Sequence, residues 1–456
     1  MPRRIKQIIL FAGDVALLYL SLWSALWIRY WGIFDASIFN RHLPIFTFVF
    51  TLWLLVFFIF GLYSLASIWS TYRALRGFLV ATLTNTFLAI FFFYFVPYFG
   101  ITPKTILFLQ LGFFVVLFPV WRIIYGRILR AVGATNNLII VGARSAPLEL
   151  ARTIVQSPEL GYNVVALFEL NGKSVPEWVS DSGILIGKNL SQLRKIIKER
   201  EINSVVVSNE LYPKVFGSLY RIIPAGADFY NLATFWEELN RSIPISEANE
   251  IWFLDNLRGV RKRLYEVRKR IMDVIFSIGF GVFVALLLPF IALGIKLSGS
   301  GPIFYKQRRV GKDGKIFEII KFRTMVPNAE KSGAKWAKKD DPRVTKFGKF
   351  LRVTRLDELP QLSNVLKGDM SFIGPRPERP EFVGRLSKKI PHYNLRHLIR
   401  PGLSGWAQVN YPYGASEEDA WKKLRYDLYY LKNRSLLLDV EIFLKTIRVV
   451  ISRKGI

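Results

Sequence analysis

Four long apolar runs at the start of the chain constrain its fold more than any other feature. They cover residues 8–31, 44–65, 78–99 and 105–125. Each run is close to the ~20 residues that an α-helix needs to cross a bilayer. Tryptophans lie mostly near the ends of the runs, as is usual where a membrane meets water: Trp23, Trp27, Trp31, Trp53, Trp69 and Trp121. The sequence therefore predicts a membrane protein with a transmembrane four-helix bundle over residues 1–130.

Positive charges set the expected orientation of these helices. Arginines and lysines gather before the first run, between the second and third, and after the fourth, whereas the other two loops carry only Arg41 and Lys104. Basic loops stay preferentially on the cytoplasmic side, so both ends of the bundle are expected in the cytoplasm. A cleavable signal peptide fits poorly, because the first run is long and no small-residue cleavage site follows it.

Residues 135–250 alternate short apolar strands with helical stretches, which indicates a small parallel α/β domain. Strands are expected over residues 137–141, 164–168 and 204–207, and helices over 145–156 and 193–200. A dinucleotide-binding loop needs three glycines so that the backbone can approach a pyrophosphate. Here only Gly142 fits, and Arg144 and Pro147 occupy the other two positions. We expect a degenerate Rossmann-like domain without a cofactor, serving regulation or dimer formation, and do not favour NAD binding.

A fifth apolar run precedes the C-terminal region and has basic residues on both sides. Arg268 and Arg270 stand before it, and Arg308 and Arg309 follow it. A spanning helix would place one of these clusters outside, against the usual distribution of charge. Pro289 removes a helical hydrogen bond and favours a bend. We expect a re-entrant helix over residues 271–297 that breaks at Pro289 and returns to the cytoplasmic face; the alternative is a proline-kinked spanning helix.

Two adjacent acids, Asp357 and Glu358, stand out in the C-terminal region. Arg352 precedes them, and a Gly-Pro-Arg-Pro turn follows at 374–377. For an isolated acidic pair, the ordinary interpretation is a solvated helix face, here on a helix that Thr345 could cap. The flanking arginines favour instead a metal or an anionic substrate.

A hairpin is expected over residues 303–325, with a turn at 311–314. Alternation along its second strand would put Lys321 and Arg323 on one face. Two cations on one side of a strand could clamp a phosphate, although the same pair would be unremarkable on a solvated edge. The tail over residues 419–451 has the pattern of a basic amphipathic helix, which suits either an anionic bilayer surface or packing on the domain.

Composition narrows the chemistry. The chain has no cysteine and three histidines, His42, His392 and His397, which excludes thiolate chemistry and disfavours histidine-based sites. Its formal net charge of +29 favours contact with anionic lipid or phosphates. A carboxylate can attack phosphorus, a second can hold Mg²⁺, and arginines can neutralise the transferring group. The residues therefore predict metal-dependent phosphoryl-type transfer at the cytoplasmic membrane face, without choosing a substrate.

Five runs in the C-terminal region resemble the bacterial sugar transferase family, the polyprenol-phosphate phosphoglycosyl transferases with one re-entrant helix. They cover residues 269–273, 298–311, 321–325, 355–378 and 400–411. The whole chain is similar to the large members, which resemble undecaprenyl-phosphate glucose or galactose phosphotransferases of exopolysaccharide, capsule and O-antigen synthesis. The resemblance implies an α/β catalytic domain over residues 265–456, on the cytoplasmic face of a bacterial inner membrane.

The resemblance also implies a role for several residues. Asp357 would attack the phosphate next to the sugar of a UDP-sugar, UMP would leave, and undecaprenyl phosphate would attack the resulting phosphosugar–aspartate ester. Glu358 would hold Mg²⁺. Lys321 and Arg352 match positions near the phosphates, and the turn of Pro375, Arg376 and Pro377 matches one associated with the nucleotide.

Other parts of the resemblance are less specific. Asp427 and Asp439 are similar to acidic positions in the family's tail, without a stated role. Many smaller members have Ser-Pro at the helix break, where this chain has Leu288 and Pro289. A homodimer is plausible by resemblance, and the sugar stays open, glucose or galactose being the commoner expectation.

Three other functions fit parts of the sequence. A membrane glycosyltransferase that moves only the sugar would release UDP instead of UMP. A basic membrane module could bind nucleic acid or an acidic polymer, as a pI of 10.1 allows; however, the basic residues are spread over membrane flanks without a nucleic-acid motif, so we expect no nucleic acid. An NAD-dependent sugar enzyme is disfavoured by the incomplete glycine loop and the lack of a Tyr-x-x-x-Lys run in residues 137–250.

Overall fold

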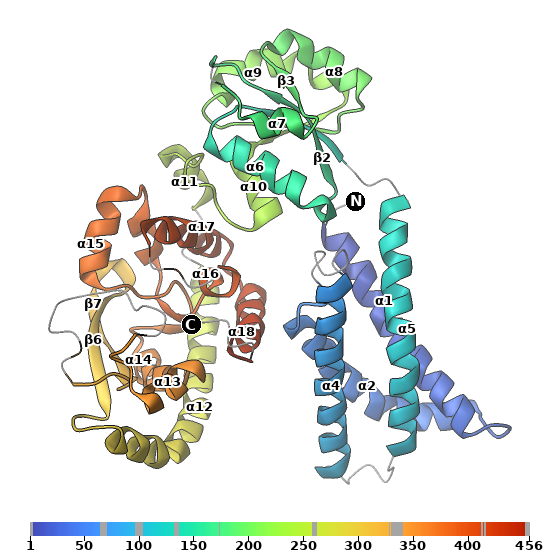
Figure 1. Cartoon of the computed structure of the whole chain (residues 1–456), viewed down its shortest axis with the longest axis vertical. Helices are drawn as coiled ribbons and strands as arrows, with labels where there is room; N and C mark the ends of the chain where they lie inside the picture. The colour runs from blue at the N-terminus through green and yellow to red at the C-terminus, as the bar shows by residue number, and fades with distance from the viewer. Residues whose placement is uncertain are drawn as a thin grey trace. The chain divides into compact units, whose positions relative to one another are not determined.

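The computed structural model describes most of the chain, in two units (Figure 1). The described residues are 3–63, 71–95, 104–131, 136–172, 174–257, 262–327, 329, 341–411, 414 and 416–451. One unit comprises Met1–Val207 with Lys214–Tyr230, and the other comprises Ser208–Pro213 with Asn231–Ile456.

The predicted apolar runs form four long helices in the first unit. They are α1 (Arg3–Arg29), α2 (Ala36–Ile59), α4 (Thr71–Phe95) and α5 (Lys104–Ala131). Three of them, α1, α2 and α5, are long and apolar enough to cross a membrane, and the apolar part of α4 among the described residues, Gly77–Phe93, is shorter. Trp69 and the ends of the second and third predicted runs, residues 64–65 and 96–99, lie outside the described residues.

Aromatic side chains and one ion pair hold these helices together. The largest fully buried side chains among them include Phe46, Phe57 and Phe114, and the rings of Phe57 and Phe114 stack with centroids 5.7 Å apart. Asp14 of α1 and Arg122 of α5 form a buried ion pair of 2.6 Å. Pairing with an opposite charge lets a charged side chain lie inside an apolar bundle. Buried side chains of all four helices belong to one hydrophobic cluster, so the four predicted helices are confirmed as one packed cluster.

A five-stranded sheet completes the first unit and confirms the predicted parallel α/β domain. Its order is β3-β2-β1-β4-β5, and β1 pairs parallel with both β2 and β4. The strands are β1 (Asn136–Val141), β2 (Tyr162–Phe168), β3 (Leu185–Gly187), β4 (Ser204–Val207) and β5 (Asp228–Asn231). The helices between them are α6 (Ser145–Gln156), α7 (Glu177–Asp181), α8 (Leu193–Glu199) and α9 (Tyr212–Tyr220). The central strands β1 and β4 are apolar and buried, and were predicted; the short outer strands β3 and β5 were not.

Two helices, one inside the predicted α/β domain and one at its end, group with the C-terminal unit. They are α10 (Leu232–Asn240) and α11 (Glu250–Asn256). Trp252 and Phe253 of α11 lie in the core of that unit, and Arg241 forms an ion pair of 2.7 Å with Glu441. The structure therefore draws the division after Tyr230, and not near residue 250, because the apolar faces of these helices are buried against the C-terminal helices.

The C-terminal unit is an α/β domain with two small sheets. The predicted hairpin is present as β6 (Phe304–Val310) and β7 (Ile316–Phe322), joined by η5 (Lys312–Gly314). A two-strand parallel ladder joins β8 (Ser371–Ile373) to β9 (Gly402–Ser404). The helices after the hairpin are α13 (Lys346–Val353), η6 (Leu356–Gln361), α14 (Leu362–Lys367), α15 (Pro380–Lys389), η7 (Tyr393–Leu398), α16 (Trp406–Asn410), α17 (Glu417–Asn433) and α18 (Leu436–Ile451). Trp406, Leu428 and Tyr430 are buried at its centre, so the predicted tail helix packs on the domain as two helices.

One helix, α12 (Arg263–Leu297), opens this domain and contains Pro289. The sequence predicted a break at Pro289, but the helix continues through it without a non-helical residue. Instead of a break, the end of α12 lies at an angle to its first part (Figure 1). A proline can bend a helix without ending it, because only the local hydrogen bond and ring contact are affected.

Both ends of α12 contact the same domain. Near the start, Asp273 accepts a hydrogen bond from Ser371, and near the end the carbonyl of Ile295 accepts one from Arg323. The 22 intervening steps would span ~33 Å in a straight helix at ~1.5 Å per residue. Between these contacts, several apolar side chains are more than half exposed, among them Ile275, Ile278, Val282 and Leu286. The middle of α12 therefore carries an apolar face that the domain does not cover.

Candidate active site

The two acids lie on a tight turn and not on the helix that was expected to carry them. Thr345 caps α13 as predicted, since its Oγ1 accepts a hydrogen bond of 2.9 Å from the amide of Gly348. However, α13 ends at Val353, and Arg355 adopts a left-handed backbone with φ 60°. Asp357 and Glu358 then begin the 3₁₀-helix η6. The turn at Arg355 redirects the chain, so that the acids face the hairpin.

Glu358 joins three separate parts of the domain. Its Oε1 accepts a hydrogen bond of 2.8 Å from Lys321 Nζ, at the end of β7. The same oxygen accepts one of 2.6 Å from Arg376 Nη2, in the loop after β8. Burial would raise the pKa of Glu358, but the charges of Arg376 and Lys321 outweigh burial and hold that pKa well below its usual range. Three residues predicted for the site thus converge on one carboxylate oxygen.

Asp357 is buried beside this cluster, but its carboxylate differs from that of Glu358 in its hydrogen bonds. Its side chain is 8% exposed, and its Oδ1 has no hydrogen-bond partner among the residues that the structure describes. Burial raises the pKa of Asp357 to about 6, and the negative charge of Glu358 adds to the effect, while Lys321 and Arg352 oppose it. A buried carboxylate oxygen without donors is poorly solvated, which makes it a stronger nucleophile than a carboxylate in water.

The loop that carries Arg376 is fixed by a close backbone crossing. The amide of Gly374 donates to the carbonyl of Ser404 at 2.8 Å, and the amide of Gly402 donates to that of Pro375 at 2.9 Å. A Cβ atom on Gly402 would lie 2.1 Å from the nitrogen of Gly374. Only glycine permits this approach, so the Gly-Pro-Arg-Pro turn at 374–377 and the backbone of β9 hold one another in place.

Two further arginines hold the backbone of the same loop. Arg396 donates to the carbonyl of Arg376 at 3.0 Å, and Arg309 donates to that of Pro377, also at 3.0 Å. Neither residue was predicted for the site. The sequence offers little signal for them, since a single arginine at the end of a strand or in a short helix has no diagnostic spacing.

Arg352 lies near the two acids, whereas Arg323 lies at the end of α12. Arg352 Nε donates to Thr324 Oγ1 at 2.9 Å, and its charge acts on Asp357. Arg323 does not share the face of Lys321: it donates to the carbonyls of Ile295 at 3.1 Å and Gly299 at 2.7 Å. The reason is that β7 ends at Phe322, so strand alternation does not extend to Arg323, and the last carbonyls of α12 need donors.

The two acids of the tail lie in buried networks. Asp427 forms an ion pair of 2.7 Å with Arg396. Asp439 accepts hydrogen bonds of 2.8 Å from Lys269 and 2.8 Å from Tyr265, both on the first turns of α12, and one of 2.7 Å from Tyr430. Asp427 therefore supports the arginine that holds the Arg376 loop, and Asp439 fixes the start of α12.

The carboxylates of the site fit a shared magnesium site and not a complete protein cage. Among the described residues, no cluster of three or more histidine or acidic side chains could hold a metal. Mg²⁺ commonly binds through one or two carboxylates together with substrate phosphates. Glu358, the residue that the resemblance implies would hold Mg²⁺, offers one such carboxylate beside the two cations that bind it.

Comparison of the sequence with known proteins identifies the family of this chain. A family model described as bacterial sugar transferase matches residues 264–453. A UDP-glucose:undecaprenyl-phosphate glucose-1-phosphate transferase of Klebsiella pneumoniae is 32% identical over 363 residues, which cover 76% of this chain and 76% of that protein. The chain belongs to the bacterial sugar transferase family. This sugar transferase is a membrane protein, since its described residues include four helices long and apolar enough to cross a bilayer, α12 among them.

Two other relatives of this sugar transferase differ in the sugar that their names give. A UDP-glucose:undecaprenyl-phosphate glucose-1-phosphate transferase of Escherichia coli strain K12 is 32% identical over 333 residues, covering 70% of this chain and 68% of that protein. A UDP-N-acetylgalactosamine-undecaprenyl-phosphate N-acetylgalactosaminephosphotransferase of Aeromonas hydrophila is 49% identical over 193 residues. That match covers 42% of this chain and 45% of that protein, so it spans less than half the length of the relative.

Proposed function

We propose that this sugar transferase moves a sugar-1-phosphate from a UDP-sugar to undecaprenyl phosphate, releases UMP, and so starts exopolysaccharide, capsule or O-antigen assembly. The observation that carries the proposal is the difference between the hydrogen bonds of the two acids. Glu358 is held by Lys321 and Arg376, whereas the buried Oδ1 of Asp357 has no hydrogen-bond partner among the described residues. The names of the relatives supply the acceptor, undecaprenyl phosphate.

In the first step, the Asp357 carboxylate attacks the phosphorus that bears the sugar. A bond forms between a carboxylate oxygen and phosphorus, and the bond from that phosphorus to the bridging oxygen breaks, so UMP leaves with the electron pair. A phosphosugar–aspartate ester remains. Lys321, Arg352 and Arg376 bring positive charge to the phosphates, which stabilises charge that develops in the transition state.

In the second step, an oxygen of undecaprenyl phosphate attacks the same phosphorus. The bond to Asp357 breaks, the carboxylate is restored, and undecaprenyl-diphosphate-sugar is released. Mg²⁺, held by Glu358 together with the donor phosphates, would supply positive charge to the diphosphate and to the departing UMP. The loop of Pro375, Arg376 and Pro377 positions the nucleotide in this proposal, because its backbone is fixed on both sides.

The contacts of α12 support the proposed location on the cytoplasmic face of a bacterial inner membrane. Asp273 and Ile295 both bond to the same domain, and a domain on one side of a bilayer could not reach both ends of a straight spanning helix. We therefore propose that α12 enters and leaves the membrane on one side, with Pro289 at the bend. This places Asp357 where it can meet a soluble nucleotide and a lipid phosphate in turn.

The donor that we propose first is a UDP-N-acetylhexosamine. The relative named for N-acetylgalactosamine has the higher identity over its matched segment, 49% against 32% for the glucose enzymes. Its matched length is shorter than that of the glucose enzymes, so both donors belong in the test.

The experiment is a donor panel with identification of the released nucleotide. Full-length protein in lipid nanodiscs receives Mg²⁺, undecaprenyl phosphate and either UDP-N-acetylgalactosamine, UDP-glucose or UDP-galactose, and the products are separated by ion-exchange chromatography. Release of UMP that requires the lipid acceptor for turnover is the expected result. Release of UDP would contradict the proposal and would indicate a glycosyltransferase that moves the sugar alone.

A further inference from the structure

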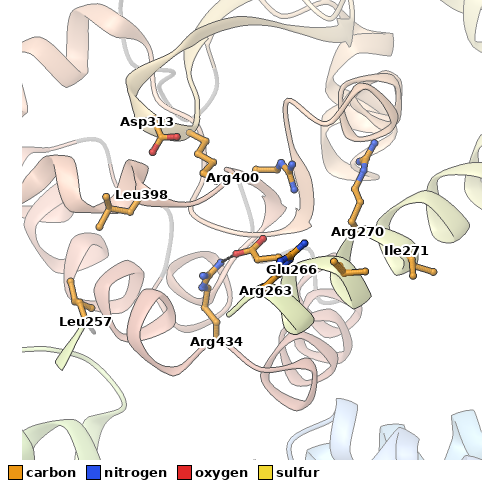
Figure 2. Close-up of a pocket in the computed structure, with 11 residues that line it drawn as sticks. Leu257, Arg263, Glu266, Arg270, Ile271, Asp313, Leu398, Arg400 and Arg434 are labelled. Atoms are coloured by element: carbon orange, nitrogen blue, oxygen red, sulfur yellow. Dashed lines mark hydrogen bonds and ion pairs between the residues drawn. The ribbon is translucent and has the colours of Figure 1, made fainter. Parts of the chain in front are cut away.

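A second site of the C-terminal domain lies at the start of α12, away from the two acids. It is a cavity with a volume of 810 Å³ (Figure 2). Residues of α12, the hairpin turn and the two loops near Leu398 and Arg434 form its walls: Leu257, Arg263, Glu266, Val267, Arg270, Ile271, Lys312, Asp313, Leu398, Arg400 and Arg434. The turn that carries Lys312 is at one end of β7, and Lys321, which binds Glu358, is near the other. Lys321 lies five steps along the strand from Ile316, ~17 Å at ~3.3 Å per residue, so the cavity is distinct from the acid site.

The cavity is basic, and part of its charge is unpaired. Five of its lining side chains are cationic and two are acidic, which leaves an excess of three positive charges. Glu266 is neutralised by an ion pair with Arg434. Among the described residues, no hydrogen bond or ion pair is made by the side chains of Arg263 and Arg400. Figure 2 shows the guanidinium groups of Arg263, Arg400 and Arg434 around one space. Such an arrangement suits an anion with several oxygens, a phosphate above all.

The floor of the cavity continues into the apolar face of α12. Val267 lies four residues after Arg263, and Arg270 and Ile271 lie three and four residues after Val267, so these residues share one side of the helix. The same spacing leads from Ile271 to Ile275, Ile278, Val282 and Leu286, whose exposed fractions are 60, 56, 62 and 68%. One helix face therefore changes from basic to apolar, and the change occurs inside the cavity.

We propose that the cavity binds the phosphate headgroup of an anionic bilayer phospholipid, with its acyl chains along the exposed face of α12. A phospholipid joins a phosphate to apolar chains, and this face joins a phosphate site to an apolar strip in the same order. Basic residues beside a membrane segment attract anionic lipid, and Arg263 and Arg400, which have no partner among the described residues, would gain charge-assisted hydrogen bonds. The bound lipid is a resident of the site and not the substrate; the inference rests on the membrane contact of α12 and not on the transfer reaction.

The test measures lipid binding to the full-length protein in detergent. Phosphatidylglycerol and phosphatidylcholine are added separately, and bound lipid is counted by native mass spectrometry. The variant is Arg263→Gln combined with Arg400→Gln, and the matched control is Arg268→Gln, an exposed arginine of the same helix that does not line the cavity. We expect tight binding of phosphatidylglycerol to the wild type and the control. In the double variant, the dissociation constant should be at least tenfold larger. Equal binding to all three proteins would overturn the proposal.

Three further arms separate a lipid from other phosphates. Ile271→Ser should weaken phosphatidylglycerol binding, since it interrupts the apolar strip, and unchanged binding would contradict the lipid assignment. Millimolar inorganic phosphate or UMP should not displace the lipid; displacement would show that the cavity takes a free anion or the nucleotide. Asp357→Asn should bind lipid as the wild type does, which distinguishes this site from the transfer reaction. Thermal unfolding of each variant checks that loss of binding is not loss of fold.

Discussion

Asp357 and Glu358 are neighbours in the chain, and their carboxylates have opposite surroundings. Glu358 accepts hydrogen bonds from Lys321 at 2.8 Å and Arg376 at 2.6 Å. Asp357 is buried, and its Oδ1 has no hydrogen-bond partner among the described residues. The pKa of Glu358 is well below its usual range, whereas that of Asp357 is about 6. Near neutral pH both groups are ionised, but only Asp357 is free to attack.

The rate of transfer should therefore depend on the ionisation of Asp357. In the proposed mechanism the Asp357 carboxylate is the nucleophile, so kcat/KM is expected to rise with pH through about 6, the pKa of Asp357, and to level above it. In Glu358→Gln, loss of the neighbouring negative charge should move this limb to lower pH, although the residual rate falls as well. Initial rates of UMP release between pH 5 and 8 give the profile. A limb that does not move in Glu358→Gln would contradict the coupling of the two acids.

Asp357→Asn should abolish transfer and at the same time stabilise the fold near neutral pH. The raised pKa, about 6 against an ordinary value of 3.8 for an aspartate, means that the folded protein holds this proton more tightly than the unfolded chain does. Stability from this group is therefore fully present below the unfolded pKa and is lost as the pH rises through the folded pKa, a cost of ~3 kcal/mol at 1.36 kcal/mol per unit. We expect a higher Tm for the variant at pH 7.5 and a smaller difference at pH 5, where about half of the free-energy cost remains. A Tm that falls equally at both pH values would contradict the predicted cost.

Lys321 and Arg323 are a matched pair for separating chemistry from structure. Lys321→Ala should remove a charge next to the acids and lower kcat/KM by roughly 10²-fold, the usual scale for loss of one electrostatic contact to a transition state. Arg323→Ala should instead free the carbonyls at the end of α12 and lower the Tm, with KM for the UDP-sugar within about twofold of the wild type. Steady-state kinetics and thermal unfolding of both variants decide. A larger kinetic effect for Arg323 than for Lys321 would instead support the prediction from the sequence that both residues bind a phosphate.

The contrast between Lys321 and Arg323 shows which features could be predicted from the sequence. The apolar runs, the central strands, the hairpin and the cap at Thr345 were predictable because each depends on local periodicity or on one side chain bonding nearby backbone. The position of Arg323 was not, since it depends on where β7 ends and on the carbonyls of a helix more than twenty residues away in the chain. For the same reason the sequence pointed to Arg376 but not to Arg396, which acts only through backbone supplied by a distant loop.

The grouping of α10 and α11 with the C-terminal unit could not be read from the sequence for a related reason. The segment from α10 to α11 has the same mixture of apolar and polar residues as the helices of the α/β domain. Its assignment is decided by partners far along the chain, such as Glu441 for Arg241. Similarly, a sequence containing Pro289 favours a bend, but whether the helix ends there or continues depends on what packs against its second part.

Asp427 should act on the donor site through Arg396. The two form a buried ion pair of 2.7 Å, and Arg396 also binds the carbonyl of Arg376. Asp427→Asn leaves a buried guanidinium without its counter-charge, a change that typically costs ~3–5 kcal/mol. We expect a lower Tm and a severalfold higher KM for the UDP-sugar, with a smaller effect on kcat, because the Arg376 loop is displaced and Asp357 is not. A fall in kcat with an unchanged KM would argue for a direct role of Asp427 in the reaction.

Gly402→Ala should disable the site without changing any functional side chain. The new Cβ would lie 2.1 Å from the nitrogen of Gly374 and 2.7 Å from its Cα, so the two backbones must separate. Since the neighbouring atoms are backbone, the shift should move the loop of Arg376 and loosen its contact with Glu358. Gly384→Ala is the matched control, because a Cβ there meets no atom within 4 Å and Gly384 lies in the helix α15; alanine should be neutral or stabilise that helix by up to ~1 kcal/mol. We expect loss of UMP release in the first variant and wild-type release in the second, and normal transfer by Gly402→Ala would show that the backbone crossing does not position the site.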